Sequence, residues 1–231
     1  MVTKAKNIHI VGIGGIGLSS LAQLLHHQGK RISGTDRTAS SVTAMLERRG
    51  IKVFTAPSAE NIPQGTELLI YSDAVPMDDP ERKVAREHGI PELSYFEALG
   101  QVTLGNYLIV VSGTHGKTTT TAMLADILEE AELDPTVIVG SIRAKTKSNF
   151  QAGQGRYFLV EGDEYLRHFL FFTPNILVIN NIDADHLDYY KDLADIQNAF
   201  KELAQKVPQD GFIVTNPNHP HIAPVLEGVV A

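Results

Sequence analysis

Residues 113–118, Gly-Thr-His-Gly-Lys-Thr, combine the side chains and the backbone freedom needed to bind a polyphosphate. Glycines allow several backbone N–H groups to face one anion, and the N-terminus of a following helix adds partial positive charge. The Lys117 ammonium could neutralise the outer phosphates, and the Thr118 hydroxyl could bind Mg²⁺. The longer pattern G-x-x-x-x-G-K-[ST] is not met, because Val111 stands at its first glycine. The alternative interpretation is an ordinary glycine-rich turn before a helix.

The segments on either side of this loop are those needed to position it. Tyr107–Val111 is an apolar run typical of a buried strand. After the loop, apolar residues recur at the spacing of a helix packed on a sheet: Met123, Leu124, Ile127 and Leu128. The sequence therefore predicts a nucleotide-phosphate site formed by Gly113, Thr114, His115, Gly116, Lys117, Thr118 and Thr119.

A second glycine motif lies near the N-terminus. Residues 12–17, GIGGIG, fit G-x-G-x-x-G between a strand at residues 8–11 and a helix that stops at Gly29. Asp36 ends the next predicted strand, roughly 20 residues beyond the motif, where a dinucleotide-binding fold has its ribose-binding acid. On these residues alone, a nicotinamide-dependent oxidoreductase domain is one open interpretation.

Two apolar strands in the second half of the chain end in polar segments. Glu161 follows the strand at residues 157–160, and His186 follows the strand at residues 175–182 within Asp-Ala-Asp-His-Leu-Asp. In an open parallel sheet, ligands bind at the carboxyl ends of the strands, so these side chains could converge on the phosphate loop. Mg²⁺ prefers oxygen ligands, which favours Thr118 and Glu161 over His186.

Structural roles are the alternatives for these same residues. Glu161 and His186 could be ordinary loop side chains, and Asp185 and Asp188 could cap the helix that begins near Leu193.

The first hundred residues alternate helix and strand signals, at residues 40–50, 51–56, 67–75 and 78–89. This alternation predicts a parallel sheet with helices on both faces. The predicted fold class is therefore α/β, with a Rossmann-like parallel-sheet domain at residues 1–103. A P-loop NTPase-like α/β domain is predicted at residues 104–231, and the boundary is expected between Gly100 and Gly105.

Composition narrows the class of protein. The 231 residues include 20 Lys and Arg, 27 Asp and Glu, and no cysteine, for a formal charge of −7. The acidic balance argues against binding to nucleic acid or to a membrane surface. The lack of cysteine excludes disulfides and thiolate chemistry within this sequence. The N-terminus runs into a strand without an apolar leader, so we expect a cytoplasmic protein.

Four motifs together resemble the Mur ligases: GIGGIG, SGTHGKTTTT, VEGDEY and NNIDADHLDYY. The similarity spans essentially the whole chain. His115, inside GTHGKT, narrows the resemblance to two branches, one that adds L-alanine to UDP-N-acetylmuramic acid and one that recycles a murein tripeptide. The DADHLDYY segment favours the alanine-adding branch.

This resemblance implies an ATP- and Mg²⁺-dependent ligase of peptidoglycan synthesis. The substrate carboxylate would attack the γ-phosphate of ATP, and the amine of L-alanine would then displace phosphate from the acyl phosphate. Lys117 would bind the β- and γ-phosphates, Thr118 and Glu161 would hold one Mg²⁺, and His186 would help to hold a second. The resemblance thus implies Lys117, Glu161 and His186 as the catalytic residues.

The resemblance also reassigns the first glycine motif from NAD to the UDP-sugar. The residues expected to receive it are Gly12, Gly14, Gly15, Gly17, Asp36 and Ser72. Asp73 is a weaker candidate, and a plain polar turn is the alternative for Ser72 and Asp73.

Two features depart from the family pattern. Some members carry a carbamylated lysine after the histidine motif, but Lys201 gives no clear match there, so we do not expect it to be catalytic. Family members also have a third, C-terminal domain that carries the amino-acid site, whereas this sequence stops at Ala231. The central domain is therefore expected to be truncated, and a non-catalytic UDP-sugar-binding module stays open as an alternative function.

Overall fold

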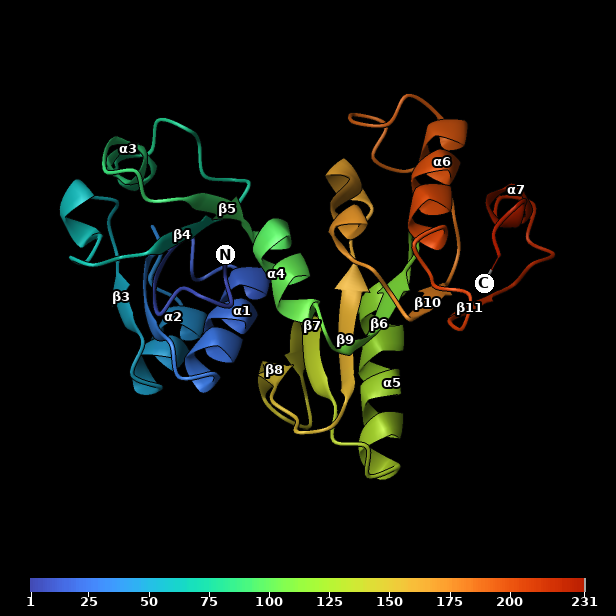
Figure 1. Cartoon of the computed structure of the whole chain (residues 1–231), viewed down its shortest axis with the longest axis horizontal. Coiled ribbons are helices and arrows are strands. Elements are labelled where there is room, and N and C mark those ends of the chain that lie inside the picture. Colours follow the sequence, from blue (N-terminus) through green and yellow to red (C-terminus); the bar gives the residue numbers. More distant parts are fainter. Residues whose placement is uncertain (231) are drawn as a thin grey trace. The chain divides into compact units, whose positions relative to one another are not determined.

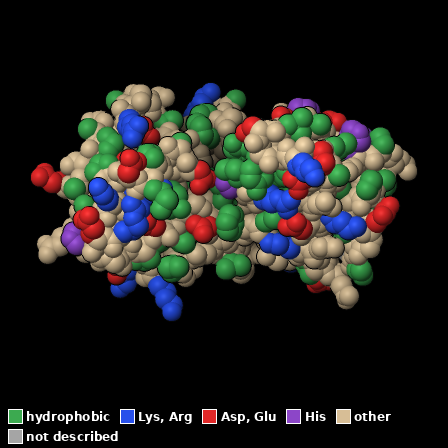
Figure 2. Space-filling view, turned by 90° about the horizontal axis from the view of Figure 1, so that it is seen from above, with side chains coloured by type: hydrophobic (Ala, Val, Ile, Leu, Met, Phe, Trp, Pro, Cys, Tyr) green, Lys and Arg blue, Asp and Glu red, His purple; other side chains and the backbone are tan. Residues whose placement is uncertain are grey.

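The computed structural model describes residues 1–230. The chain divides into two compact units, Met1–Val102 and the residues from Thr103 onward. Within the described residues, no helix is long and apolar enough to span a membrane. Acidic and basic side chains are interspersed on the face shown in Figure 2, with no extended basic patch on that face.

The first unit is built on a five-stranded parallel sheet of order β3-β2-β1-β4-β5. Its strands are β1 (Asn7–Val11), β2 (Arg31–Thr35), β3 (Lys52–Phe54), β4 (Leu68–Tyr71) and β5 (Glu92–Ser94). The chain moves outward from β1 to β3 and then returns to β4 on the other side of β1. The carboxyl ends of β1 and β4 therefore flank the switch point at which such sheets bind ligands.

The helices of this unit are α1 (Ile16–His27), α2 (Ser41–Arg48), α3 (Pro80–Glu87), α4 (Tyr95–Thr103) and the short 3₁₀ helix η1 (Ala59–Asn61). In Figure 1, α1 and α2 lie on one side of the strands and α3 on the other. Ser40 caps α2 by accepting a hydrogen bond from the Thr43 N–H, and Asp79 caps α3 ahead of Pro80. The predicted parallel sheet with helices on both faces is confirmed.

The second unit contains a mixed six-stranded sheet of order β11-β10-β6-β9-β7-β8. Its strands are β6 (Tyr107–Ser112), β7 (Thr136–Arg143), β8 (Ser148–Gln151), β9 (Tyr157–Gly162), β10 (Ile176–Ile179) and β11 (Phe212–Thr215). Its helices are α5 (Lys117–Glu130), the 3₁₀ segment η2 (Tyr165–Phe171), α6 (Leu193–Ala204) and α7 (Ala223–Leu226). All neighbouring strands run parallel except β7 and β8, which form an antiparallel pair absent from the sequence prediction.

Helix α5 packs on this sheet through a face that only partly overlaps the predicted one, since Leu124 and Leu128 contact the core as expected. Its buried residues are Thr121, Ala125 and Leu128, whereas Met123 and Ile127 are each 61% exposed. The helical spacing was right, but the assignment of Met123 and Ile127 to the packed face was wrong. Small side chains at positions 121 and 125 let the helix axis approach the apolar core around Ile109 and Leu159.

Candidate nucleotide sites

The loop between β6 and α5 bends at two glycines. Gly113 has φ +132° and Gly116, the N-cap of α5, has φ +82°. A Cβ at position 113 would lie 3.0 Å from the carbonyl oxygen of Asn181, in a backbone conformation that other residues rarely adopt. The sequence pattern of strand, loop and helix is therefore realised, with the start of α5 directed at the loop.

Side chains from the segment after β10 hold this loop in place. The Asn181 side-chain oxygen accepts a hydrogen bond from the His115 N–H at 2.8 Å. The Thr114 hydroxyl oxygen accepts one from the Asp183 N–H at 2.9 Å. Asn180 also contributes, since its amide nitrogen donates to the Thr120 hydroxyl at 3.1 Å. These asparagines were not singled out from the sequence, although they open the NNIDADH segment that was.

The Lys117 ammonium is bound within the loop and to a buried acid. It donates to the Gly113 carbonyl at 2.8 Å and contacts the two carboxylate oxygens of Glu164 at 2.7 and 3.0 Å. Only 2% of the Glu164 side chain is exposed. Burial raises the pKa of Glu164, while the Lys117 charge and hydrogen bond oppose that rise. Glu164 was not predicted as a site residue, although it belongs to the run of acids after β9.

Thr118 and Glu161 meet as the sequence predicted. The Thr118 hydroxyl donates to one Glu161 carboxylate oxygen at 2.9 Å, and the other oxygen accepts from the Gly140 N–H on β7 at 2.6 Å. Burial raises the pKa of Glu161, against the opposing effect of these hydrogen bonds. The hydroxyl and carboxylate oxygens suit Mg²⁺, which binds few protein ligands and keeps several waters.

His186 also lies near Glu164. Its Nε2 is 3.8 Å from a Glu164 carboxylate oxygen, and its ring centre is 4.8 Å from that of Tyr165. Lys117 and His186 thus both lie near the Glu164 carboxylate. No three His, Asp or Glu side chains in residues 1–230 gather closely enough to hold a metal ion by themselves. An ion here would need oxygens from Thr118, a bound phosphate or water as well.

The two other aspartates of the histidine segment make local contacts and do not cap the following helix. Asp185 accepts from the His186 N–H, and Asp188 accepts from the Tyr165 hydroxyl. Asp192 is the N-cap of α6, accepting from the Asp195 N–H at 2.9 Å. Helix α6 begins at Leu193 as expected, but Asp192 caps it, so the alternative cap role for Asp185 and Asp188 is wrong.

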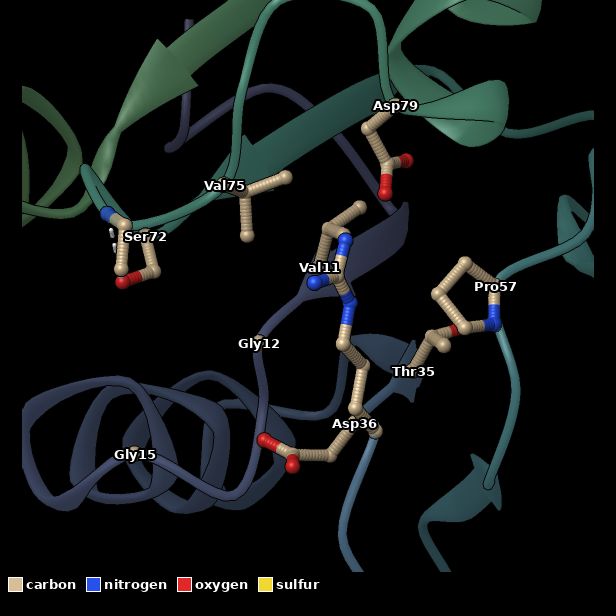
Figure 3. A pocket seen from close by; sticks show the side chains of 11 residues that line it. Val11, Gly12, Gly15, Thr35, Asp36, Pro57, Ser72, Val75 and Asp79 are labelled. Atoms are coloured by element: carbon tan, nitrogen blue, oxygen red, sulfur yellow. Dashed lines mark hydrogen bonds between the residues drawn. The ribbon is translucent and has the colours of Figure 1, made fainter.

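A pocket of about 300 Å³ lies at the switch point of the first unit (Figure 3). Five chain segments line it, at the ends of β1, β2, β3 and β4 and at the start of α3. Four of the residues expected to bind the UDP-sugar line this pocket: Gly12, Gly15, Asp36 and Ser72. The other two, Gly14 and Gly17, are not among its lining residues. Arg37, a cation that was not among the predicted site residues, also lines the pocket.

Asp36 and Gly17 have structural contacts that the motif alone did not reveal. One Asp36 oxygen accepts from the Gly14 N–H at 2.9 Å and the other from the Thr38 N–H at 3.0 Å, so the acid helps to hold the glycine loop. A Cβ at Gly17 would lie 2.6 Å from the ring of Tyr95 on α4. Gly17 therefore permits the close packing of two helices.

The two units correspond to two known family domains. Residues 7–107 match the domain described as "Mur ligase family, catalytic domain", and residues 111–228 match the "Mur ligase middle domain". The chain belongs to the Mur ligase family. The resemblance predicted from the four sequence motifs is thereby confirmed, together with the α/β fold class.

Several relatives in this family have closely similar sequences. The chain is 42% identical over 219 residues to a UDP-N-acetylmuramate–L-alanine ligase of Alkaliphilus metalliredigens, covering 94% of this chain and 47% of that protein. It is 44% identical over 212 residues to the ligase of the same name from Clostridium novyi, covering 91% and 46%. The chain thus spans about half the length of the curated Mur ligase relatives it matches.

Two solved ligase structures are similar to this chain. A UDP-N-acetylmuramate–alanine ligase from Thermotoga maritima matches with a TM-score of 0.84 and 32% identity, covering 95% of this chain and 51% of that one. A UDP-N-acetylmuramate:L-alanyl-γ-D-glutamyl-meso-diaminopimelate ligase from Neisseria meningitides matches with a TM-score of 0.88 and 29% identity, covering 96% and 74%.

Proposed function

We propose that this chain is the UDP-sugar- and ATP-binding part of a ligase that joins L-alanine to UDP-N-acetylmuramic acid in peptidoglycan synthesis. The observation that carries the proposal is the convergence of Lys117, the Thr118–Glu161 pair and His186 beside a phosphate-type loop. Relatives more than 40% identical bear the name of that ligase. Residues 1–103 would bind the UDP-sugar and residues 104–231 the ATP, in the cytoplasm.

The loop residues would bind and orient the polyphosphate. The N–H groups of Thr114 and His115 already donate to Asn181, so the free N–H groups at the start of α5 would face the anion. Lys117 would supply the positive charge. Thr119 is an exposed residue one position after Thr118, in the first turn of α5. When bound, ATP supplies the phosphoryl group that turns a substrate carboxylate into an electrophile, with Mg²⁺ offsetting the charge that builds up.

The acids and the histidine would fix the geometry of that transfer. Thr118 and Glu161 would hold one Mg²⁺ through oxygen atoms that already lie 2.9 Å apart. His186 would help to hold a second. A carboxylate oxygen of the substrate would bond to the γ-phosphorus as ADP leaves, and the alanine amine would then displace phosphate with loss of a proton. The first step brings two anions together, so a fixed positive charge in the site lowers its barrier.

In the first unit, the switch-point pocket would receive the uridine part of the substrate. The wall residues Gly12, Gly15, Asp36 and Ser72 are the predicted ligand residues that line it. Asp36 retains acceptor capacity on both oxygens beyond its two backbone hydrogen bonds, which suits a ribose hydroxyl.

A second candidate is the ligase branch that attaches a recycled murein tripeptide. The match to the Neisseria structure favours it, because that ligase has the higher TM-score of the two and 74% of its chain is covered. Both branches share the nucleotide and the UDP-sugar, so their difference lies in the amine substrate. Comparing L-alanine with the tripeptide as acceptor, in a polypeptide with ligase activity, separates the two.

Ligand binding tests the proposal directly. Isothermal titration of the purified chain with UDP-N-acetylmuramic acid, with MgATP and with NAD should show binding of the first two only. Thermal denaturation provides a second readout, because a ligand at a hundred times its Kd adds ~2.7 kcal/mol to the free energy of unfolding. Binding of NAD with no response to UDP-N-acetylmuramic acid would overturn the proposal in favour of an oxidoreductase.

A further inference from the structure

The start of α3 contains two charged side chains that are buried although they lie outside the glycine loop. Glu81 is fully buried and Arg82 is 6% exposed. A charged group is seldom buried unless every polar atom has a partner. The partners of Glu81 and Arg82 come from the segments that form the wall of the switch-point pocket.

The Glu81 carboxylate ties together β1, β2 and the loop after β3. One of its oxygens lies 3.0 Å from Nε2 of His9 on β1, and Nδ1 of His9 lies 2.8 Å from the Ser33 hydroxyl on β2. The other oxygen accepts from the Ser58 N–H at 3.1 Å and from the Asn61 side-chain nitrogen at 2.8 Å. The Asn61 side-chain nitrogen also donates to the hydroxyl of Thr35, a pocket residue at the end of β2, at 3.3 Å.

Arg82 and Asp79 attach the two remaining segments. The Arg82 guanidinium donates to the Val75 carbonyl at 2.8 Å, and Val75 lines the pocket after β4. The same guanidinium lies over the Tyr71 ring and donates to Glu92 at 2.9 Å. Asp79, itself a pocket residue, accepts from the Glu81 N–H at 2.9 Å. Figure 3 shows Val75 and Asp79 on the same wall of the pocket.

We propose that Glu81 and Arg82 are positioning residues for the UDP-sugar: they hold all five pocket-forming segments in the arrangement that binds it. This inference rests on the proposed function of the first unit. Neither residue lines the pocket, so each acts through the segments it bonds. A role in fold stability alone would leave the ligand affinity of the folded protein unchanged, and that difference can be measured.

The test compares two affinities in the same protein. Glu81→Gln keeps the size of the side chain but removes its charge and leaves one acceptor oxygen in place of two, so either His9 changes tautomer or one buried donor loses its acceptor. We expect the affinity for UDP-N-acetylmuramic acid to fall by about tenfold or more. The affinity for MgATP, measured on the same sample, should stay unchanged, because that site lies in the other unit.

Two further variants complete the experiment. Arg82→Lys keeps the charge but cannot reach Glu92 and Val75 with one planar group, and it gives the same test should Glu81→Gln not fold. Glu67→Gln is the matched control, since Glu67 also accepts two backbone N–H groups, from Lys6 and Asn7, at the amino end of β1. The affinity of the Glu67→Gln variant for the UDP-sugar should equal that of the unmodified protein.

The outcomes separate this inference from the proposed function. Selective loss of UDP-sugar binding in Glu81→Gln and Arg82→Lys supports the positioning role. Unchanged UDP-sugar affinity in the folded variants, or a parallel loss of MgATP affinity, overturns that role. If the unmodified protein binds no UDP-N-acetylmuramic acid, the proposed function fails first, and the positioning role fails with it.

Discussion

The ammonium of Lys117 lies 2.7 Å from the carboxylate of Glu164, a buried acid just beyond the end of β9. The lysine also donates to the carbonyls of Gly113 and Thr114, at 2.8 and 3.4 Å. An ammonium group has three N–H donors, so all three have acceptors in the structure. A phosphate that binds Lys117 must therefore replace one of them, and Glu164 is the acceptor that carries a competing negative charge.

We predict that Glu164→Gln binds MgATP more tightly than the unmodified protein. Removing the charge weakens the interaction of residue 164 with Lys117 and also the repulsion of phosphate. The Kd for MgATP should therefore fall on the order of tenfold, or ~1.4 kcal/mol. Isothermal titration with MgATP measures it. Asp163→Asn, which removes a charge one residue earlier without a hydrogen bond to Lys117, is the control. Weaker binding by Glu164→Gln would show that the carboxylate belongs to the nucleotide site itself.

Replacement of Lys117 by Met should weaken MgATP binding while leaving the UDP-sugar site intact. Hydrogen bonds to charged groups contribute ~1.5–3 kcal/mol, so the loss should be about tenfold to a hundredfold. The substitution also leaves Glu164 buried without its counterion, so the free energy of unfolding should fall. Titrations with both ligands check this, and equal MgATP affinity in Lys117→Met would remove Lys117 from the phosphate site.

The contribution of Glu81 to stability should depend on pH in a defined direction. Burial alone would raise the pKa of Glu81, but hydrogen bonds from His9 and Asn61 hold the pKa below its ordinary value of 4.5. A lowered pKa means that the stabilisation is fully present above pH 4.5 and is lost as the pH falls through the folded-state pKa. Urea denaturation should find Glu81→Gln less stable by ~1–3 kcal/mol at neutral pH. The two unfolding curves should converge in acid, and a constant gap at all pH values would contradict this account.

Gly17 should act through helix packing and not through direct ligand contact. Gly17→Ala places a methyl group against the Tyr95 ring, which should lower the free energy of unfolding by ~1–3 kcal/mol. In a Tyr95→Leu background most of that loss should disappear, and a double-mutant cycle measures the coupling. Additive effects of the two substitutions would show that the ring is not what Gly17 accommodates.

Much of the fold follows from local sequence signals. The order of strand, glycine loop and helix appears twice, and the Asp79-Pro80 pair begins α3 as expected from capping chemistry. The antiparallel pair β7–β8 was not predicted, since neither strand has a clear alternation of apolar and polar residues and no tight-turn dipeptide joins them. On α5, two adjacent helical stripes contain apolar residues, and spacing alone could not tell which one faces the sheet.

The site was predicted less completely than the fold. The sequence placed Thr118 and Glu161 together because both follow strands at one edge of a sheet, and the structure joins them by a hydrogen bond. Glu164 was missed because it lies beyond the strand, where the chain turns and side-chain direction no longer follows the two-residue period. The network around Glu81 was also missed, because its members are spread over four segments whose proximity depends on the tertiary fold.

The backbone amide of Gly140 offers a spectroscopic view of the second unit. Its proton points at a Glu161 oxygen from β7, and position 140 lies between Ile138 and Arg143, where the register of the β7–β8 pair shifts. An amide proton resonance is sensitive to the charge of its acceptor. In a ¹⁵N-labelled sample, the Gly140 cross-peak would therefore report any cation that approaches Glu161, before and independently of chemical turnover.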